Sequence, residues 1–215
     1  MNGKKTIDSF LLNAKVAIEN GITNTEIAGI MAEFGYTSEK MADGNALLVK
    51  ANELNIKQKK EYGEQYAATD AVSSKYDEIN GSYMKHVKLA RLVFKNERDK
   101  YKSLELSGER KRSLSGWISQ TKQFYTGMLS EEGNITGILK YGITKEKLEA
   151  GLTGVKELEQ LKAAKEKETG EAQQATLERD TCLDELNEWI GEFRTVARIA
   201  LEDKPQYLEI IGIKA

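Results

Sequence analysis

The feature that most constrains this chain is that its sequence resembles itself at an offset of 107 residues, without a gap. Residues 34–41, FGYTSEKM, return as residues 141–148, YGITKEKL. Between residues 34 and 96, 17 of the 63 positions are identical to their partners, where composition alone would give roughly four. Such self-similarity predicts a duplicated unit of secondary structure. We call two residues that lie 107 positions apart counterparts.

Composition favours helices. The chain has 31% charged and 40% hydrophobic residues and a single proline, the residue that breaks helices most strongly. We therefore predict an all-α fold in which a tandem duplication packs as a pseudo-two-fold helical bundle. The expected organisation is a first repeat at 7–104, a connector at 105–115 and a second repeat at 116–213, forming one compact domain or two closely packed halves. Because Cys182 is the only cysteine, an internal disulfide is excluded.

Several positions mark the ends and packing faces of the expected helices. Gly35 and its counterpart Gly142 stand where a helix ends in a left-handed residue, and Thr37 and Thr144 are then the next N-caps. Thr23 and Glu26 form an expected capping box in the first repeat. An apolar seam with alternating spacings of three and four predicts a buried helix face in each repeat; it includes Ile79, Tyr83, Ala90, Leu186, Ile190, Phe193 and Ala197, with His86 on the same side as Tyr83.

Glycines inside the expected helices make two further predictions. Gly44 and Gly151 each cost a helix up to about 1 kcal/mol, so their presence in both repeats predicts close helix crossings. At Gly63 and Gly170 the chain either reverses, making a hairpin, or runs on as one very long helix. We favour the reversal, because a 60-residue helix would be about 90 Å long. The tail after Pro205 is apolar and is expected to pack on the bundle.

The sequence contains no recognisable catalytic set. With one histidine and one cysteine it cannot build the usual zinc or di-iron sites, so we expect no metal and no cofactor; a site made of carboxylates alone is an open alternative. It lacks a phosphate loop and a nucleophile paired with a base. The net charge of −2 divides into about +1 for residues 1–107 and −3 for 108–215. We therefore predict no nucleic-acid and no membrane partner.

A weak candidate for a ligand or partner surface comes from aromatic residues of the first repeat. Tyrosine is favoured where one end is buried and the other meets water or a partner. His86 falls on the apolar seam, where its counterpart is Phe193. Packing at a wet rim of the core is the explanation that we favour for these residues, with a recognition surface or pocket as the alternative. The candidate residues are Tyr62, Tyr66, Tyr76, Tyr83 and His86.

These observations lead to two hypotheses about function. The first is a non-enzymatic helical-bundle protein with an interaction or structural role, for which a protein partner and a homo-oligomer are both open. The alternative is a small-molecule binding bundle with a tyrosine-lined pocket. An enzyme that uses carboxylates and tyrosines is a weaker third hypothesis. Since the sequence has neither a signal-peptide pattern nor a long apolar stretch, we expect a soluble, cytoplasmic protein.

Overall fold

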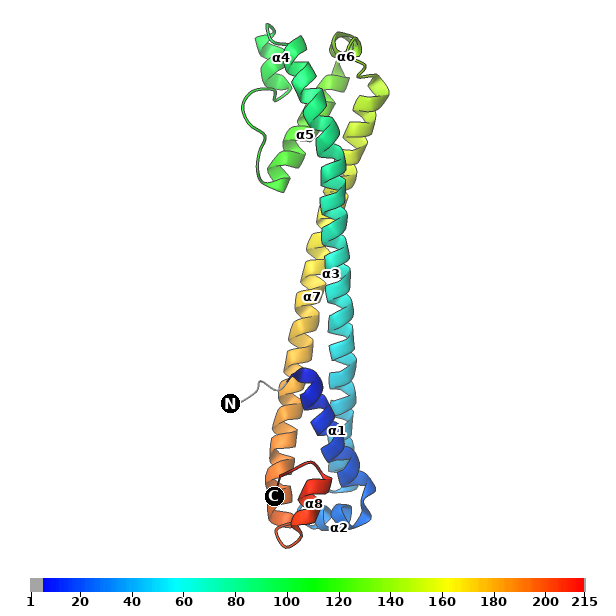
Figure 1. The fold of residues 1–215 in the computed structure, drawn as a ribbon, viewed down its shortest axis with the longest axis vertical. Helices are drawn as coiled ribbons and strands as arrows, with labels where there is room; N and C mark the ends of the chain where they lie inside the picture. Colours follow the sequence, from blue (N-terminus) through cyan, green and yellow to red (C-terminus); the bar gives the residue numbers. More distant parts are fainter. Residues whose placement is uncertain (1–5, 215) are drawn as a thin grey trace. The chain divides into compact units, whose positions relative to one another are not determined.

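A computed structural model describes residues 6–214 and confirms the all-α prediction, since it contains no strand in this range. The helices, labelled in Figure 1, are α1 (Ile7–Thr23), α2 (Thr25–Glu33), α3 (Ser38–Val93), α4 (Arg98–Ser103), α5 (Leu114–Ser130), α6 (Glu132–Leu139), α7 (Lys145–Ala200) and α8 (Pro205–Ile210). None of the helices within residues 6–214 combines the length and apolar character that crossing a membrane requires.

The helix boundaries repeat with the sequence. Helices α1, α3 and α4 begin and end 107 residues before α5, α7 and α8, and α2 differs from α6 only by one residue at its end. The two longest helices, α3 and α7, both contain 56 residues. Residues 34–96 and 141–203 therefore form the same elements in the same order.

The predicted reversal at Gly63 and Gly170 is wrong. Helix α3 runs through Gly63 and α7 runs through Gly170 without interruption. Neither glycine has the positive φ that a helix end with a left-handed residue requires, whereas Gly35 and Gly142 have φ of +86° and +75°. In addition, Gly35 and Gly142 are each followed two residues later by an N-capping threonine, and nothing after Gly63 or Gly170 caps a new helix.

Because the long helices do not reverse, the compact units of the molecule differ from the sequence repeats. One unit contains residues 1–62 and 171–215, and we call it the terminal unit; the other contains residues 63–170, and we call it the central unit. Each unit thus combines the first half of one repeat with the second half of the other. The connector, 105–115, lies within the central unit.

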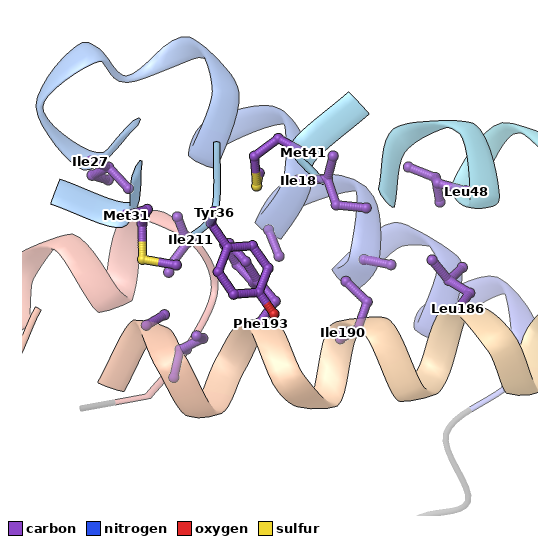
Figure 2. Packing of buried hydrophobic residues seen from close by; sticks show 14 of the residues in the cluster. Ile18, Ile27, Met31, Tyr36, Met41, Leu48, Leu186, Ile190, Phe193 and Ile211 are labelled. Carbon is purple, nitrogen blue, oxygen red and sulfur yellow. The ribbon is translucent and has the colours of Figure 1, made fainter. Parts of the chain in front are cut away.

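The core of the terminal unit is built by α1, α2, the start of α3, the end of α7 and α8. Figure 2 shows Tyr36 close to Phe193 of α7, and their ring centroids are 5.2 Å apart. The tail packs here as predicted, since Leu208, Ile211 and Ile213 are buried. The seam residues of α7 are buried in this core: Leu186, Ile190, Phe193 and Ala197.

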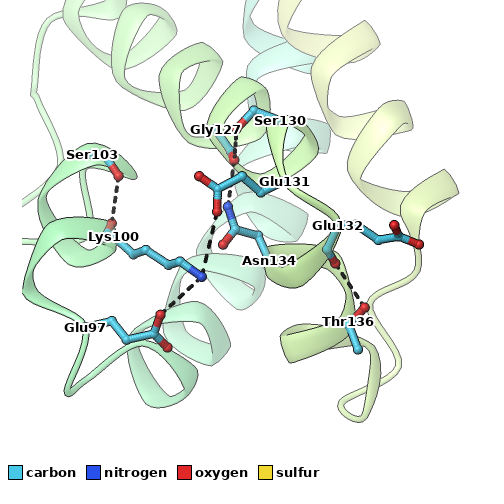
Figure 3. A network of polar contacts seen from close by, with 9 residues as sticks. All are labelled: Glu97, Lys100, Ser103, Gly127, Ser130, Glu131, Glu132, Asn134 and Thr136. Carbon is cyan, nitrogen blue, oxygen red and sulfur yellow. Dashed lines mark hydrogen bonds and ion pairs between the residues drawn. The ribbon is translucent and has the colours of Figure 1, made fainter.

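The core of the central unit uses the corresponding elements α5, α6, the start of α7, the end of α3 and α4. Its seam residues Ile79, Tyr83 and Ala90 are buried, so the predicted seam is confirmed in both units. Polar contacts hold the helix ends in place. As Figure 3 shows, Lys100 of α4 pairs with Glu97 (3.1 Å) and with Glu131 (3.8 Å), just before α6.

Most of the predicted helix caps are confirmed. The Thr37 and Thr144 hydroxyls accept from the backbone N–H groups of Lys40 and Lys147, both at 3.4 Å. The Thr23 capping box is wrong, because α1 extends to Thr23 and Asn24 caps α2 instead. Asparagine is among the strongest N-capping residues, and its side chain accepts from two N–H groups at 3.1 Å.

Candidate ligand pocket in the central unit

The central unit contains a pocket of about 360 Å³ between α3, α5 and α7. Its walls mix small residues, charged residues and two buried polar side chains. This combination suits a small molecule that has an apolar part and a hydrogen-bonding group. The lining residues are Glu78, Ile79, Ser82, Lys85, His86, Tyr125, Lys147, Ala150, Gly151 and Gly154.

His86 and Tyr125 form the buried polar part of the pocket. A hydrogen bond joins His86 Nδ1 to Tyr125 Oη at 3.2 Å, and the hydroxyl donates when Nδ1 carries no proton. Burial, with the positive charges of Lys147 and Lys85 adding to it, lowers the pKa of His86 below its ordinary value. Burial, reinforced by Tyr83, raises the pKa of Tyr125 far above its usual range. At neutral pH the pocket therefore offers an uncharged imidazole and a protonated phenol.

In the terminal unit, the counterpart of this pocket is filled by an aromatic cluster. Trp189 lies against Gly44 so closely that a Cβ placed there would come within 2.4 Å of the indole ring. The indole stacks on Phe193, with centroids 5.5 Å apart, and meets Tyr36 edge-on at 5.7 Å. The glycine at position 44 is thus required by the close approach of Trp189, as the sequence predicted.

Smaller residues replace this cluster in the central unit. The counterparts of Trp189 and Phe193 are Ser82 and His86. Leu47, which packs against the same terminal core, has Gly154 as its counterpart. Tyr125 takes up part of the space: a Cβ on Gly151 would lie 2.3 Å from its ring, which confirms the close crossing predicted at that glycine. The space that Tyr125 leaves unfilled forms the pocket.

The structure brings together some of the sequence candidates and separates others. His86 lines the pocket, and Tyr83 lies next to it, with its ring centroid 6.0 Å from that of Tyr125. Tyr83 is fully buried, and its hydroxyl accepts a hydrogen bond from Arg110 Nη1 at 2.8 Å. Tyr76 packs on Trp117, with centroids 4.6 Å apart, and both line a second pocket of about 460 Å³.

The two other tyrosines lie in different units. Tyr62 belongs to the terminal unit, where about a third of its surface is exposed. Tyr66 belongs to the central unit and is 65% exposed. Neither lines the His86 pocket.

Reasoning from the sequence missed Ser82, Lys85, Tyr125 and Lys147 as pocket residues. A usable signal was present in the repeat, because a tryptophan and a glutamate in one copy, Trp189 and Glu192, correspond to Ser82 and Lys85 in the other. Replacement of a large residue by a small one at counterpart positions indicates that one of two similar cores is incompletely filled.

Comparisons of the chain with known protein families, with curated proteins and with solved structures give no match. The fold and the pocket define the class instead: an all-α protein of two helical units, with a pocket beside His86 and Tyr125 in the central unit.

Proposed function

We propose that this protein is a non-enzymatic, tandemly duplicated helical protein whose central unit binds a small molecule in the His86–Tyr125 pocket. The proposal rests mainly on one structural difference between counterpart positions in the two units. Trp189 fills the space beside Gly44 in the terminal unit, whereas in the central unit Tyr125 lies against Gly151 and a pocket stays open between Ser82, Tyr125 and Gly151. On this view the terminal unit has a structural role, and the central unit has the binding role.

Tandem duplication is part of the proposal. It is supported by the 17 identities between residues 34–96 and their counterparts, and by helix boundaries that recur after 107 residues. A duplicated gene segment leaves two similar cores, and one of them can then lose a packing residue and gain a ligand while the other preserves stability. The pseudo-two-fold packing and the cytoplasmic location stay predictions from the sequence.

Binding is favoured over catalysis by the absence of an activated nucleophile in the pocket. Ser82 and His86 are four residues apart on α3, but no hydrogen bond links the two side chains in the part of the chain that is described. Nucleophilic catalysis requires such a link between the nucleophile and its base. We therefore assign the hydroxyl and the imidazole to ligand recognition.

The first sequence hypothesis, an interaction or structural protein with a protein partner or as a homo-oligomer, is our second proposal. It is supported by the exposed apolar side chains of α1 and α3, among them Leu12 and Ile56, which are 63% and 68% exposed. Single exposed apolar residues are ordinary on protein surfaces, however, and a contiguous patch is the stronger sign of a partner. The pocket is therefore the better-supported basis for a function.

A screen with a refilled pocket tests the proposal. A library of small metabolites is scanned for compounds that raise the melting temperature of the wild-type protein and of Ser82→Trp, which restores the side chain found at position 189. We expect compounds that stabilise the wild type by binding its folded state and that lose this effect in Ser82→Trp. If every stabilising compound acts equally on both proteins, the pocket is not the binding site and the proposal is wrong.

A further inference from the structure

A lysine at the pocket has a different electrostatic environment from its counterpart. In the terminal unit, Lys40 pairs with Glu192 at 3.8 Å and lies over the ring of Tyr36, 4.2 Å from its centroid. Its charge is therefore balanced within the unit. The acidic residue Asp43 lies one helical turn further along α3.

In the central unit, each of these partners has been replaced. The counterpart of Lys40 is Lys147, and in place of Glu192 the pocket has a second lysine, Lys85. Ala150 replaces Asp43, and Ile143 replaces Tyr36. The central unit thus has neither acidic residue at these positions, and two lysines line one pocket.

No carboxylate of the described chain balances these two lysines. Lys147 Nζ donates to the backbone oxygen of Gly142 at 2.7 Å, and neither Lys85 nor Lys147 forms an ion pair within residues 6–214. The one acidic residue that lines the pocket, Glu78, pairs with Lys75 at 3.1 Å. Both lysines act on His86, since each contributes to lowering its pKa. The pocket consequently has unbalanced positive charge next to neutral hydrogen-bond donors.

We propose that the ligand of the central pocket is an organic carboxylate, held by Lys85 and Lys147. This inference rests on the proposed binding function and adds the chemical class of the ligand. The ligand's carboxylate takes the role that Glu192 has in the terminal unit. Its apolar body occupies the space beside Ile79, Ser82 and Gly154, where the terminal unit has the larger Trp189 and Leu47 as the counterparts of Ser82 and Gly154.

The lining favours a carboxylate over a phosphate. The pocket has two lysines and no arginine, so its cations act as point charges on an anion, and the rest of the lining has to select the anion. Part of its wall is apolar, and this favours an acid with an organic body. The Ser82 hydroxyl can donate one hydrogen bond to its carboxylate, and the Tyr125 hydroxyl can donate another when His86 Nδ1 carries the proton. A monovalent acid with an aromatic or aliphatic body matches both the charge and the wall.

The test compares acids with their neutral amides. Benzoate, phenylacetate and indole-3-acetate are titrated into the full-length protein by isothermal titration calorimetry at pH 7, each beside its amide, with inorganic phosphate as a further probe. We expect at least one acid to bind at least tenfold more tightly than its amide and than phosphate. Raising the salt concentration should weaken this binding, because screening reduces the lysine–carboxylate attraction.

Two variants and one control locate the effect. Lys85→Glu recreates the residue of the terminal unit and should pair with Lys147, so we expect acid binding to weaken at least tenfold. Lys88→Glu makes the same charge change on an exposed residue of α3 outside the pocket lining, and it should change the affinity for the acid by less than twofold. Ser82→Trp should abolish binding of acids and amides alike, and circular dichroism establishes that each variant is folded.

The outcomes separate the two proposals. If amides bind as tightly as acids and Ser82→Trp abolishes both, the pocket binds small molecules but the carboxylate assignment is wrong. If phosphate binds more tightly than every acid, the chemical class is wrong as well. If acids bind equally to the wild type, Lys85→Glu and Ser82→Trp, both the assignment and the pocket itself are contradicted.

Discussion

The terminal and central units use the same helix crossing in two ways. In the terminal unit Trp189 covers Gly44, stacks on Phe193 and leaves no pocket between them; in the central unit Ser82 and His86 stand at the counterpart positions, beside a pocket of about 360 Å³. The charges differ as well. Lys40 pairs with Glu192 in the terminal unit, whereas the counterparts of these two residues, Lys147 and Lys85, are both lysines. The comparison teaches that similar helices can enclose either a closely packed aromatic cluster or an open pocket, depending on a few side chains.

The largest expected effect comes from opening the closed unit. Trp189→Ser removes an indole that packs on Phe193, Tyr36 and Gly44. Because Trp189 is half-buried, we expect the low end of the range for large-to-small core changes, a loss of about 3 kcal/mol in the free energy of unfolding. Urea denaturation followed by circular dichroism measures it. Ser82→Ala is the matched control and should change stability by less than about 0.5 kcal/mol; equal losses in both variants would contradict the contrast.

Glycine-to-alanine substitutions should change the free energy of unfolding by a smaller amount, and the sign of this change should differ between positions. Gly44→Ala and Gly151→Ala place a Cβ 2.4 and 2.3 Å from ring atoms, so we expect each to cost about 1–3 kcal/mol. Gly63→Ala and Gly170→Ala meet nothing within 4 Å inside continuous helices and should stabilise by about 0.5–1 kcal/mol. Urea denaturation of the four variants decides the matter. A neutral Gly44→Ala or a destabilising Gly63→Ala would show that the close crossings or the continuous helices are wrongly described.

The contrast between those glycines also shows what the sequence could and could not predict. Gly35 and Gly142 were predictable as helix ends, because each precedes an N-capping threonine by two residues. Gly63 and Gly170 lack such a cap, and a glycine alone costs a helix too little to end it. We predicted a reversal at these glycines because a continuous helix would be about 90 Å long, although neither glycine is followed by a cap. The continuity of α3 and α7 then fixed which halves of the repeats form each unit.

The pocket was less predictable than the fold. The seam of Tyr83, Phe193 and their neighbours follows from spacing along one helix, so its burial could be predicted. Tyr125 and Lys147 come from other helices, and nothing in their local sequence indicates that they face His86. Such contacts depend on tertiary packing. The sequence pointed to this place through His86 and through the differences between counterparts, Trp189 against Ser82 and Glu192 against Lys85.

A smaller effect is expected in the pH dependence of stability. The folded-state pKa of His86 is lowered, so below the ordinary value of about 6.5 the unfolded chain binds more protons than the folded one. Stability should therefore be complete above pH 6.5 and decline as the pH falls toward the lowered pKa. His86→Phe, which introduces the residue of position 193, should flatten this decline. The measurement is the free energy of urea unfolding between pH 5 and pH 8.

The control for this prediction lies in the other groups of the pocket. Glu78, Lys85, Lys147 and Tyr125 line the same pocket and are unchanged in His86→Phe. Any titration of theirs contributes to both proteins, so the difference between the two pH profiles isolates the histidine. Parallel profiles would mean that His86 is not held in its neutral form by burial.

The most direct test of the account is a titration that observes both units at once. Phenylacetate is added to ¹⁵N-labelled protein, and the amide resonances around Ser82, His86 and Gly151 are compared with those of their counterparts around Trp189, Phe193 and Gly44. We predict saturable shifts at the first set and none at the second, because the space between Trp189 and Gly44 is filled by the indole ring, whereas Ser82, His86 and Gly151 line a pocket with two lysines. Equal shifts in both sets, or saturable shifts confined to the terminal unit, would contradict the account.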